Sequence, residues 1–275
     1  MKKVVENSIN YFDGKHLYGD DFTLEQITQW YNIEAEAYAN MSGVQKSNDS
    51  SYEYHHLNIF YAYRYLRNHK SFHNVLGLGS SWGYEFLPII KKIQRLTIIE
   101  SSLQTRSLKL GENLVPNYQS PHEDGHVDAK DNSFDLITCF DVMHHIPNVS
   151  FVLKELFRVL QSNGFLLLRE PIHSMGDWRK KRPFLTSNER GIPKAYFQNV
   201  IEQNGFEIVR KNYYFCMTDF LKRTFPALKT SAWWYLYLDK LLSRLLTFNI
   251  HYHPTTKIQR MSPTSVFYVL RKPVL

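Results

Sequence analysis

The residues that first suggest a ligand site form a glycine-rich turn and an acidic residue further along the chain. The turn, Gly77-Leu78-Gly79-Ser80-Ser81-Trp82-Gly83, runs from an apolar stretch into a helical pattern. Glycines at such a place let the backbone approach a ligand, and the start of a helix presents free N–H groups. Glu100 ends the next apolar run, where an acidic residue accepts the ribose hydroxyls of an adenosine cofactor. A nicotinamide cofactor is less favoured, because the third glycine falls at position 83 and not at 82.

Side chains that can exchange protons follow the later apolar runs of the sequence. They are His144, His145, Arg169, Glu170 and His173. Histidine or a carboxylate can accept a proton at neutral pH, and ligands of open α/β sheets bind beyond the carboxyl ends of the strands. We therefore expect the catalytic base to be His145, Glu170 or His173, in no fixed order. A structural role as a packed histidine or as an ion pair with arginine is the alternative for each.

The cysteines and the C-terminal histidines do not form a metal-binding pattern. Cys139 and Cys216 have no cysteine at the spacing of a zinc site, and we expect both to be free, reduced thiols. His251 and His253 stand two residues apart without a nearby acidic partner. The sequence therefore predicts no metal site.

The elements that must position these residues are apolar runs alternating with helical patterns. Strands are expected at Asn74–Leu78, Leu96–Ile99, Phe134–Phe140 and Phe165–Leu168, with helices at Trp82–Lys92 and Val149–Leu160. This alternation implies parallel strands joined by right-handed crossovers. We expect an α/β fold with a Rossmann-like, doubly wound, mostly parallel sheet. Pro193 suits the first turn of another helix, which should end at Gly205.

A helical segment is expected before the sheet. Thr23 and Gln26 have the spacing of a capping box, and a second helical pattern runs from Tyr54 to Asn68. We expect residues 1–70 to form an N-terminal helical segment that caps the site, and residues 71–275 to form the main domain.

A second addition is expected near the C-terminus. The last two strands, near 207–215 and 265–270, should form a hairpin with a helical insertion at about 215–263. Within it, Trp233–Leu246 repeats apolar residues at helical spacing. A cap over the acceptor site is the preferred interpretation, and a dimer face or a helix at a membrane surface are the alternatives.

Composition limits the class of protein. A chain of 275 residues with 43% hydrophobic residues can bury a full core, and its formal net charge of +7 favours an acidic partner. No uninterrupted apolar run of 18 residues occurs, and residues 1–14 lack the apolar core of a signal peptide. We therefore expect a cytoplasmic protein.

Residues 74–170 resemble class I S-adenosylmethionine-dependent methyltransferases. The resemblance rests on Gly79-x-x-x-Gly83, on Glu100 and, more specifically, on two blocks of sequence. These are Asp131-Asn-Ser-Phe-Asp-Leu-Ile137 and Asp141-Val-Met-His-His-Ile-Pro-Asn148. A looser similarity of Glu170–Pro193 points to methyltransferases of bacterial surface-glycan biosynthesis. The basic residues of that stretch could hold a phosphate or carboxylate of the acceptor, or simply form a solvated loop. They are Arg179, Lys180, Lys181, Arg182 and Arg190.

The resemblance implies S-adenosyl-L-methionine as the cofactor and assigns its contacts. The glycine turn would flank the methionine part, Glu100 would hold the ribose, and the turn at residues 123–125 would contact the adenine. Phe140 and Asp141, at the end of the expected strand Phe134–Phe140, would lie near the sulfur. The implied cofactor-binding residues are Gly77, Gly79, Ser80, Gly83, Glu100, Asp124, Gly125, Phe140 and Asp141.

Two positions depart from the family pattern. Gly77 replaces the acidic residue that usually helps to hold the amino group of the cofactor, and Ser81 replaces the middle glycine. Binding should then be weaker, or Glu85 or Asp141 should substitute for the missing acid.

The expected function is methyl transfer to an oxygen or nitrogen of a small acidic acceptor, such as a sugar or nucleotide-linked sugar. Methylation of a lipid, quinone or other aromatic molecule is one alternative, and a degenerate binding protein without turnover is another. The basic charge permits nucleic acid as a partner, but no appended RNA-binding motif is recognised, so we do not expect it.

Overall fold

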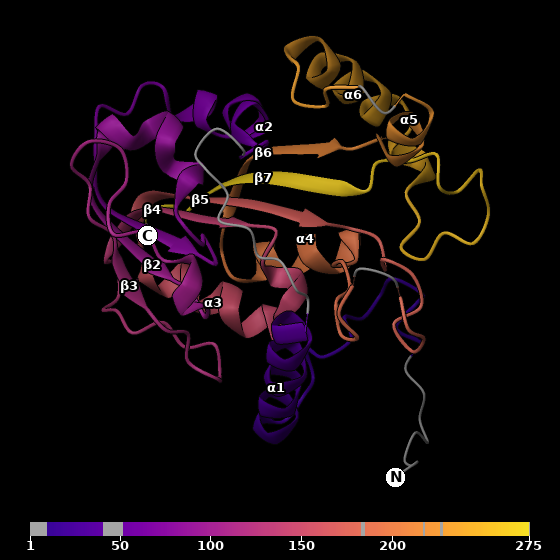
Figure 1. Ribbon diagram of the computed structural model, residues 1–275, viewed down its shortest axis with the longest axis horizontal. Helices are drawn as coiled ribbons and strands as arrows, with labels where there is room; N and C mark the ends of the chain where they lie inside the picture. Colours follow the sequence, from indigo (N-terminus) through magenta and orange to yellow (C-terminus); the bar gives the residue numbers. More distant parts are fainter. Residues whose placement is uncertain (1–9, 41–51, 183–184, 217, 226–227, 275) are drawn as a thin grey trace.

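The structure, a computed structural model, describes residues 10–40, 52–182, 185–216, 218–225 and 228–274. In this part of the chain, seven strands form one sheet in the order β3-β2-β1-β4-β5-β7-β6 (Figure 1). Their bounds are β1 Phe72–Leu78, β2 Ile93–Ile99, β3 Asn117–Gln119, β4 Phe134–Phe140, β5 Leu160–Pro171, β6 Glu207–Tyr214 and β7 Ser265–Arg271. Strands β1 to β5 are parallel, and β7 runs antiparallel to both β5 and β6. The expected α/β, mostly parallel sheet is confirmed.

Helices cover both faces of the sheet and create two buried cores. On one face, α3 and α4 bury side chains such as Val152, Leu156 and Phe197 against the sheet. On the other face, α2 and α6 bury Phe60 and Leu236 (Figure 1). The α-helices are α1 Leu24–Asn40, α2 His55–Tyr61, α3 Val149–Val159, α4 Lys194–Gln203, α5 Thr218–Thr224 and α6 Trp233–Leu245. The 3₁₀ helices are η2 Tyr63–Leu66, η3 Tyr84–Lys92, η4 Leu103–Thr105, η5 Met143–His145 and η6 Thr247–Asn249.

The predicted elements differ from the observed ones in several places, and the helical pattern at Tyr54–Asn68 is divided at Ala62 into α2 and η2. The expected helix at Trp82–Lys92 is the 3₁₀ helix η3, which contains Pro88, a residue that cannot donate the backbone hydrogen bond of a regular helix interior. Strand β5 extends well beyond the predicted Phe165–Leu168. Strand β3 was not predicted, because three residues with exposed or half-buried side chains carry little apolar signal.

The N-terminal helices reach the carboxyl-end edge of the sheet. The capping box predicted before α1 is present, because the N–H of Thr23 donates to Gln26 Oε1 (2.9 Å) and the N–H of Gln26 donates to Thr23 Oγ1 (3.4 Å). Trp30 on α1 then donates from Nε1 to the carbonyl of His145, at 2.8 Å. The division of the chain at residue 70 stays a prediction.

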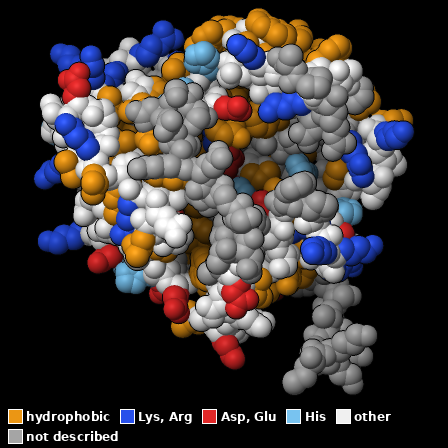
Figure 2. All heavy atoms as spheres, viewed as in Figure 1, with side chains coloured by type: hydrophobic (Ala, Val, Ile, Leu, Met, Phe, Trp, Pro, Cys, Tyr) orange, Lys and Arg blue, Asp and Glu red, His pale blue; other side chains and the backbone are white. Residues whose placement is uncertain are grey.

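In the sequence, helices α5 and α6 come between β6 and β7, where the helical insertion is expected. One side of α6 is buried through Tyr235, Leu236 and Asp239. Apolar side chains of its other side are exposed, and they gather at the top of the space-filling view (Figure 2). None of the described helices combines the length and the apolar character that crossing a membrane requires.

Candidate active site

The glycine turn follows the carboxyl end of β1 and contacts the carboxyl end of β2. Gly79 has a φ of +64°, and its N–H donates to the carbonyl of Ile99 at 2.8 Å. The N–H of Ser81 donates to Oε2 of Glu100 at 2.9 Å. A side chain at Gly79 would collide with Val142, since an added Cβ would lie 2.5 Å from its Cγ2. The turn therefore needs glycine here both for its backbone angle and for its close packing.

Glu100 directly follows a residue that lines a cavity. Its Oε1 accepts the N–H of Ser102 at 3.0 Å, so both carboxylate oxygens are oriented by backbone donors. A cavity of about 240 Å³ opens beside the preceding residue. It is lined by Ile99, Gln119, Ser120, His122, His126 and Asp128.

The loop after β3 forms part of that cavity and holds the turn expected at the adenine. Oδ1 of Asp124 accepts the N–H of His126 at 2.9 Å, and the carbonyl of Asp124 accepts from Asn148 Nδ2 at 2.7 Å. Gly125 has a φ of +83° and contacts Val152. The structure thus places this turn between the cavity and the start of α3.

A buried acid lies beneath the glycine turn, next to Gly77. Ser80 Oγ lies 2.3 Å from where a Cβ on Gly77 would be, so the serine fills the space of the absent side chain. Ser80 donates to Oε1 of Glu85 at 3.0 Å, and Thr138 on β4 donates to the same oxygen at 2.5 Å. Burial raises the pKa of Glu85 to about 7, although both hydroxyl hydrogen bonds act to lower it. A carboxylate thus occupies this corner despite the glycine at position 77.

Asp141 and Phe140 end β4 against the N-terminal segment. Asp141 has a φ of +56° and an ion pair from Oδ2 to Arg169 Nη2 at 2.7 Å. Arg169 also donates to Asn58 Oδ1 at 2.7 Å, and its guanidinium lies 4.4 Å from the ring centre of Tyr54. Phe140 is buried beside this group. The segment around α2 therefore packs on the part of the site assigned to the sulfur.

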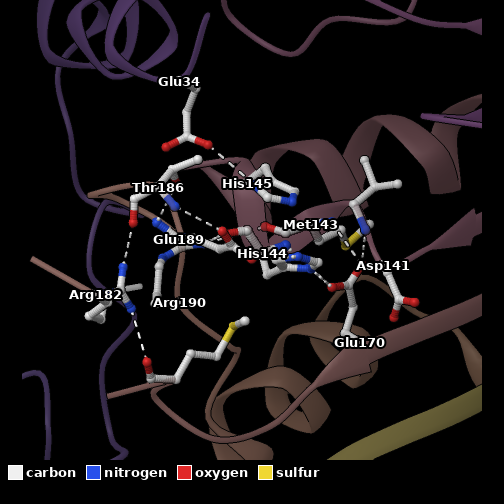
Figure 3. A network of polar contacts seen from close by, with 12 residues as sticks. Glu34, Asp141, Met143, His144, His145, Glu170, Arg182, Thr186, Glu189 and Arg190 are labelled. Carbon is white, nitrogen blue, oxygen red and sulfur yellow. Dashed lines mark hydrogen bonds and ion pairs between the residues drawn. The ribbon is translucent and has the colours of Figure 1, made fainter. Parts of the chain in front are cut away.

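Glu170 holds the short helix η5 in place. Its Oε1 accepts the N–H groups of Val142 (2.9 Å) and Met143 (2.7 Å), and Oε2 accepts Nδ1 of His144 at 2.8 Å (Figure 3). The Glu170 side chain is fully buried. Burial opposes protonation of His144, but the hydrogen bond and charge of Glu170 outweigh it and raise the pKa of the histidine. Glu170 thus fixes the position and orientation of His144.

His145 and His173 have different hydrogen-bond partners. Nδ1 of His145 is 3.2 Å from Oε2 of Glu34, a buried residue of α1. Nδ1 of His173 accepts the N–H of Met175 at 2.9 Å, and its carbonyl accepts the N–H of Gly191 at 3.1 Å. Of the three expected bases, His145 stands beside a carboxylate from another element.

The expected basic cluster does not form one surface. Arg190 is fully buried and donates to the carbonyls of Tyr18, Met143, His144, Ile146 and Pro147. Arg182 donates to the carbonyls of Met175 and Thr186. Arg179 pairs with Asp177. The proposed phosphate contact of these arginines is therefore wrong for Arg190, whose donors are taken up by carbonyl groups.

Several residues of the network carried no sequence signal. Glu34, Asn58 and Glu189 each lie more than forty residues from η5 in the sequence. Only the fold brings Glu34 and Glu189 to η5, and Asn58 to Arg169. Glu85 could be predicted from the sequence as a substitute acid, because it lies two residues after the last glycine of the turn.

Comparison with known proteins bears on the central part of the chain. Residues 76–168 match the family model described as methyltransferase domain. No curated protein matches the chain.

Solved structures extend the likeness to the fold as a whole. A Bacillus halodurans protein described as a methyltransferase has a TM-score of 0.51 and 19% identity, covering 77% of this chain and 96% of its own. An S-adenosylmethionine-dependent methyltransferase from Mesorhizobium loti has a TM-score of 0.51 and 14% identity, covering 78% and 97%. The [4+2]-cyclase SpnF has a TM-score of 0.55 and 14% identity, covering 94% and 99%.

The cyclase shows that the fold alone does not fix the reaction. The match of residues 76–168 to the methyltransferase domain is a similarity in sequence, and it indicates methyl transfer where the fold alone does not. Residues 76–168 match the methyltransferase domain, and the chain shares its fold with solved structures that include methyltransferases.

Proposed function

We propose that the protein transfers the methyl group of S-adenosylmethionine to an oxygen or nitrogen of a small acidic acceptor. The observation that carries this proposal is the arrangement of Glu100, which is held by the N–H of Ser81 in the glycine turn and directly follows Ile99, a lining residue of a cavity of about 240 Å³. This arrangement lies within the part of the chain that matches the methyltransferase domain.

The residues present fit such a cofactor. Carboxylate oxygens accept hydrogen bonds from vicinal ribose hydroxyls, and Glu100 offers both of its oxygens near the turn. The adenine would enter the cavity between β2 and the loop that carries Asp124 and Gly125. The remaining contacts fall to Gly77, Gly79, Ser80, Gly83, Phe140 and Asp141. When bound, the cofactor supplies an electrophilic methyl group.

Glu85 takes the place of the missing acid in this proposal. An ammonium group at the glycine turn needs a nearby carboxylate, since an isolated charge is costly to remove from water. Glu85 lies next to Gly77 through Ser80 and is held by Thr138, at the carboxyl ends of β1 and β4. These contacts orient its carboxylate toward the same corner of the site.

The acceptor would be activated by the histidine cluster on η5. His145, beside Glu34, is the member that we place at the acceptor. Glu170 orients His144 and so positions the cluster, and His173 supports the loop that carries Glu189 and Arg190. Holding the acceptor atom in line with the methyl group would contribute most of the rate.

The acceptor class is proposed to be a sugar or nucleotide-linked sugar. The net charge of +7 supports an acidic molecule, although it does not select among acidic molecules.

Transfer of label from methyl-labelled S-adenosylmethionine tests the proposal. The acceptor panel should begin with nucleotide sugars and include phenols, quinones and lipids, and release of S-adenosylhomocysteine should be measured in parallel. The expected result is labelled product with the native protein and, at subsaturating S-adenosylmethionine, at least about tenfold less with Glu100→Ala. Absence of product from every acceptor, in protein that binds the cofactor, would favour a binding role.

A further inference from the structure

Two histidines and a glutamate from separate segments meet at the edge of the proposed acceptor site. His144 and His145 are adjacent on η5, and Glu189 comes from the loop before α4 (Figure 3). One ligand atom of each residue lies within 4.8 Å of the others. His144 and Glu189 are buried, and His145 is partly buried. Three side chains of metal-ligand type therefore converge in a site largely shielded from solvent.

Both imidazoles are oriented by carboxylates behind them. Nδ1 of His144 lies 2.8 Å from Glu170, and Nδ1 of His145 lies 3.2 Å from Glu34. A carboxylate only accepts hydrogen bonds, so Nδ1 of each ring is the donor, and Nε2 of the neutral ring then carries a lone pair. Metal-binding histidines have this same arrangement, with a carboxylate fixing the ring on the side away from the ion.

Glu189 is held so that one oxygen points toward the histidines. Its Oε2 accepts the N–H of Thr186 at 3.1 Å, and Oε1 lies 3.7 Å from Nε2 of His144. Ligands bound to a tetrahedral zinc ion at about 2.0–2.1 Å lie about 3.3 Å apart. The observed separation is thus a few tenths of an ångström from that of a metal-bound pair.

Glu34 adds a buried carboxylate behind His145, on the side of the ring away from the cluster. The Glu34 side chain is 6% exposed, and its Oε1 has no hydrogen-bond partner among the described residues. Two arginines carry positive charge near this group: Arg182 acts electrostatically on Glu34 and Glu189, and Arg190 acts on Glu170. A buried carboxylate oxygen without a donor is costly unless a cation compensates it.

We propose that His144, His145 and Glu189 bind a divalent transition-metal ion, with Zn²⁺ as the best match, and that Glu34 and Glu170 orient the histidines. Imidazole with carboxylate suits zinc, whereas magnesium prefers oxygen ligands alone. The sequence predicted no metal, because Glu189 and the histidines are far apart in the chain and form no spacing motif.

The metal would act in the proposed function by polarising the acceptor. In the metal-bound protein His145 would be a ligand and not a base, and the ion would instead bind the acceptor hydroxyl and favour loss of its proton to solvent, which leaves an oxygen nucleophile for the methyl group. This role rests on the proposed function, but the binding of the ion does not.

The test is equilibrium dialysis of chelator-treated full-length protein against Zn²⁺, without cofactor or acceptor, followed by metal analysis. We expect one Zn²⁺ per chain, at least about tenfold weaker binding in Glu189→Gln and in Glu34→Gln, and no competition from excess Mg²⁺. Bound Co²⁺ should give visible absorption typical of nitrogen and oxygen ligands in a four- or five-coordinate site.

His73→Gln is the matched control, because Nδ1 of His73 lies 2.8 Å from Gln94 Oε1 at the start of β1, outside the cluster and outside the cofactor cavity. It should bind zinc like the native protein. Less than one ion per five chains, or equal binding by Glu189→Gln in folded protein, would overturn the metal site. Binding of S-adenosylhomocysteine by the metal-free protein is measured on the same samples, so that failure of the metal site and failure of the proposed function are distinguished.

Discussion

Glu85 is the residue whose proposed role makes the sharpest prediction. Burial raises its pKa to about 7, so in the free protein the carboxyl is protonated below that pH and ionised above it. A ligand ammonium binds the ionised form, so affinity for S-adenosylhomocysteine should rise as the pH increases from 6 to 8. Calorimetric titrations across this range should show the rise in the native protein and a weaker, flatter affinity in Glu85→Gln.

5′-Methylthioadenosine is the control ligand for Glu85, because it lacks the amino and carboxyl groups of S-adenosylhomocysteine. Its affinity should be the same for the native protein and for Glu85→Gln. If the substitution left the affinity for S-adenosylhomocysteine unchanged at every pH, the ammonium contact would have to be assigned elsewhere.

Glu100 should contribute to affinity through the ribose. Hydrogen bonds to a charged group contribute about 1.5–3 kcal/mol each. Glu100→Ala should therefore bind S-adenosylhomocysteine at least about tenfold more weakly, while circular dichroism shows the sheet intact. Equal affinity in the folded variant would contradict the ribose assignment.

At the residue scale, the sequence indicates a contact best where both partners belong to one local motif. Glu100 and the glycine turn are neighbours across β1 and β2, so their spacing in the sequence reports their contact. Glu34 lies 111 residues from His145, and nothing in local spacing points to that pair.

Among the elements, the end of α3 is hydrogen-bonded by a lysine that directly follows β7. Lys272 donates from Nζ to the carbonyls of Phe157 and Leu160, both at 2.8 Å, and to Asn132 Oδ1 at 2.9 Å. These carbonyls lie at the end of α3, where a cation is favourable and where helix hydrogen bonds end.

Lys272→Met should leave those buried acceptors without a donor. We expect a loss of about 2–4 kcal/mol in the free energy of unfolding, measured by urea denaturation. The exposed Lys91→Met serves as the comparison and should change stability by less than about 0.5 kcal/mol. A similar small change in both variants would show that Lys272 does not stabilise this junction.

The strands were easier to predict than the segments between them. Buried parallel strands read as continuous apolar runs, as Phe134–Phe140 does, and its bounds were predicted correctly. The 3₁₀ form of η3 depends on Pro88 and on tertiary packing, and β3 is too short to give a pattern.

For the whole molecule, the added segments complete the site in different ways. Helix α1 supplies Glu34 and Trp30 to η5, and the segment of α2 supplies Asn58 to Arg169. Helix α6 instead packs on β6 and exposes Tyr237, Leu241 and Leu245. A cap, dimer or membrane role for Trp233–Leu246 stays a prediction.

Calorimetric titration of the purified protein with S-adenosylhomocysteine tests the central claim most directly. We expect one site per chain with a micromolar dissociation constant, and stabilisation against unfolding by about 2.7 kcal/mol at a ligand concentration of 100 times that constant. Folded protein that shows neither binding heat nor stabilisation, with S-adenosylmethionine as well as with S-adenosylhomocysteine, would contradict the assignment of this site to the cofactor.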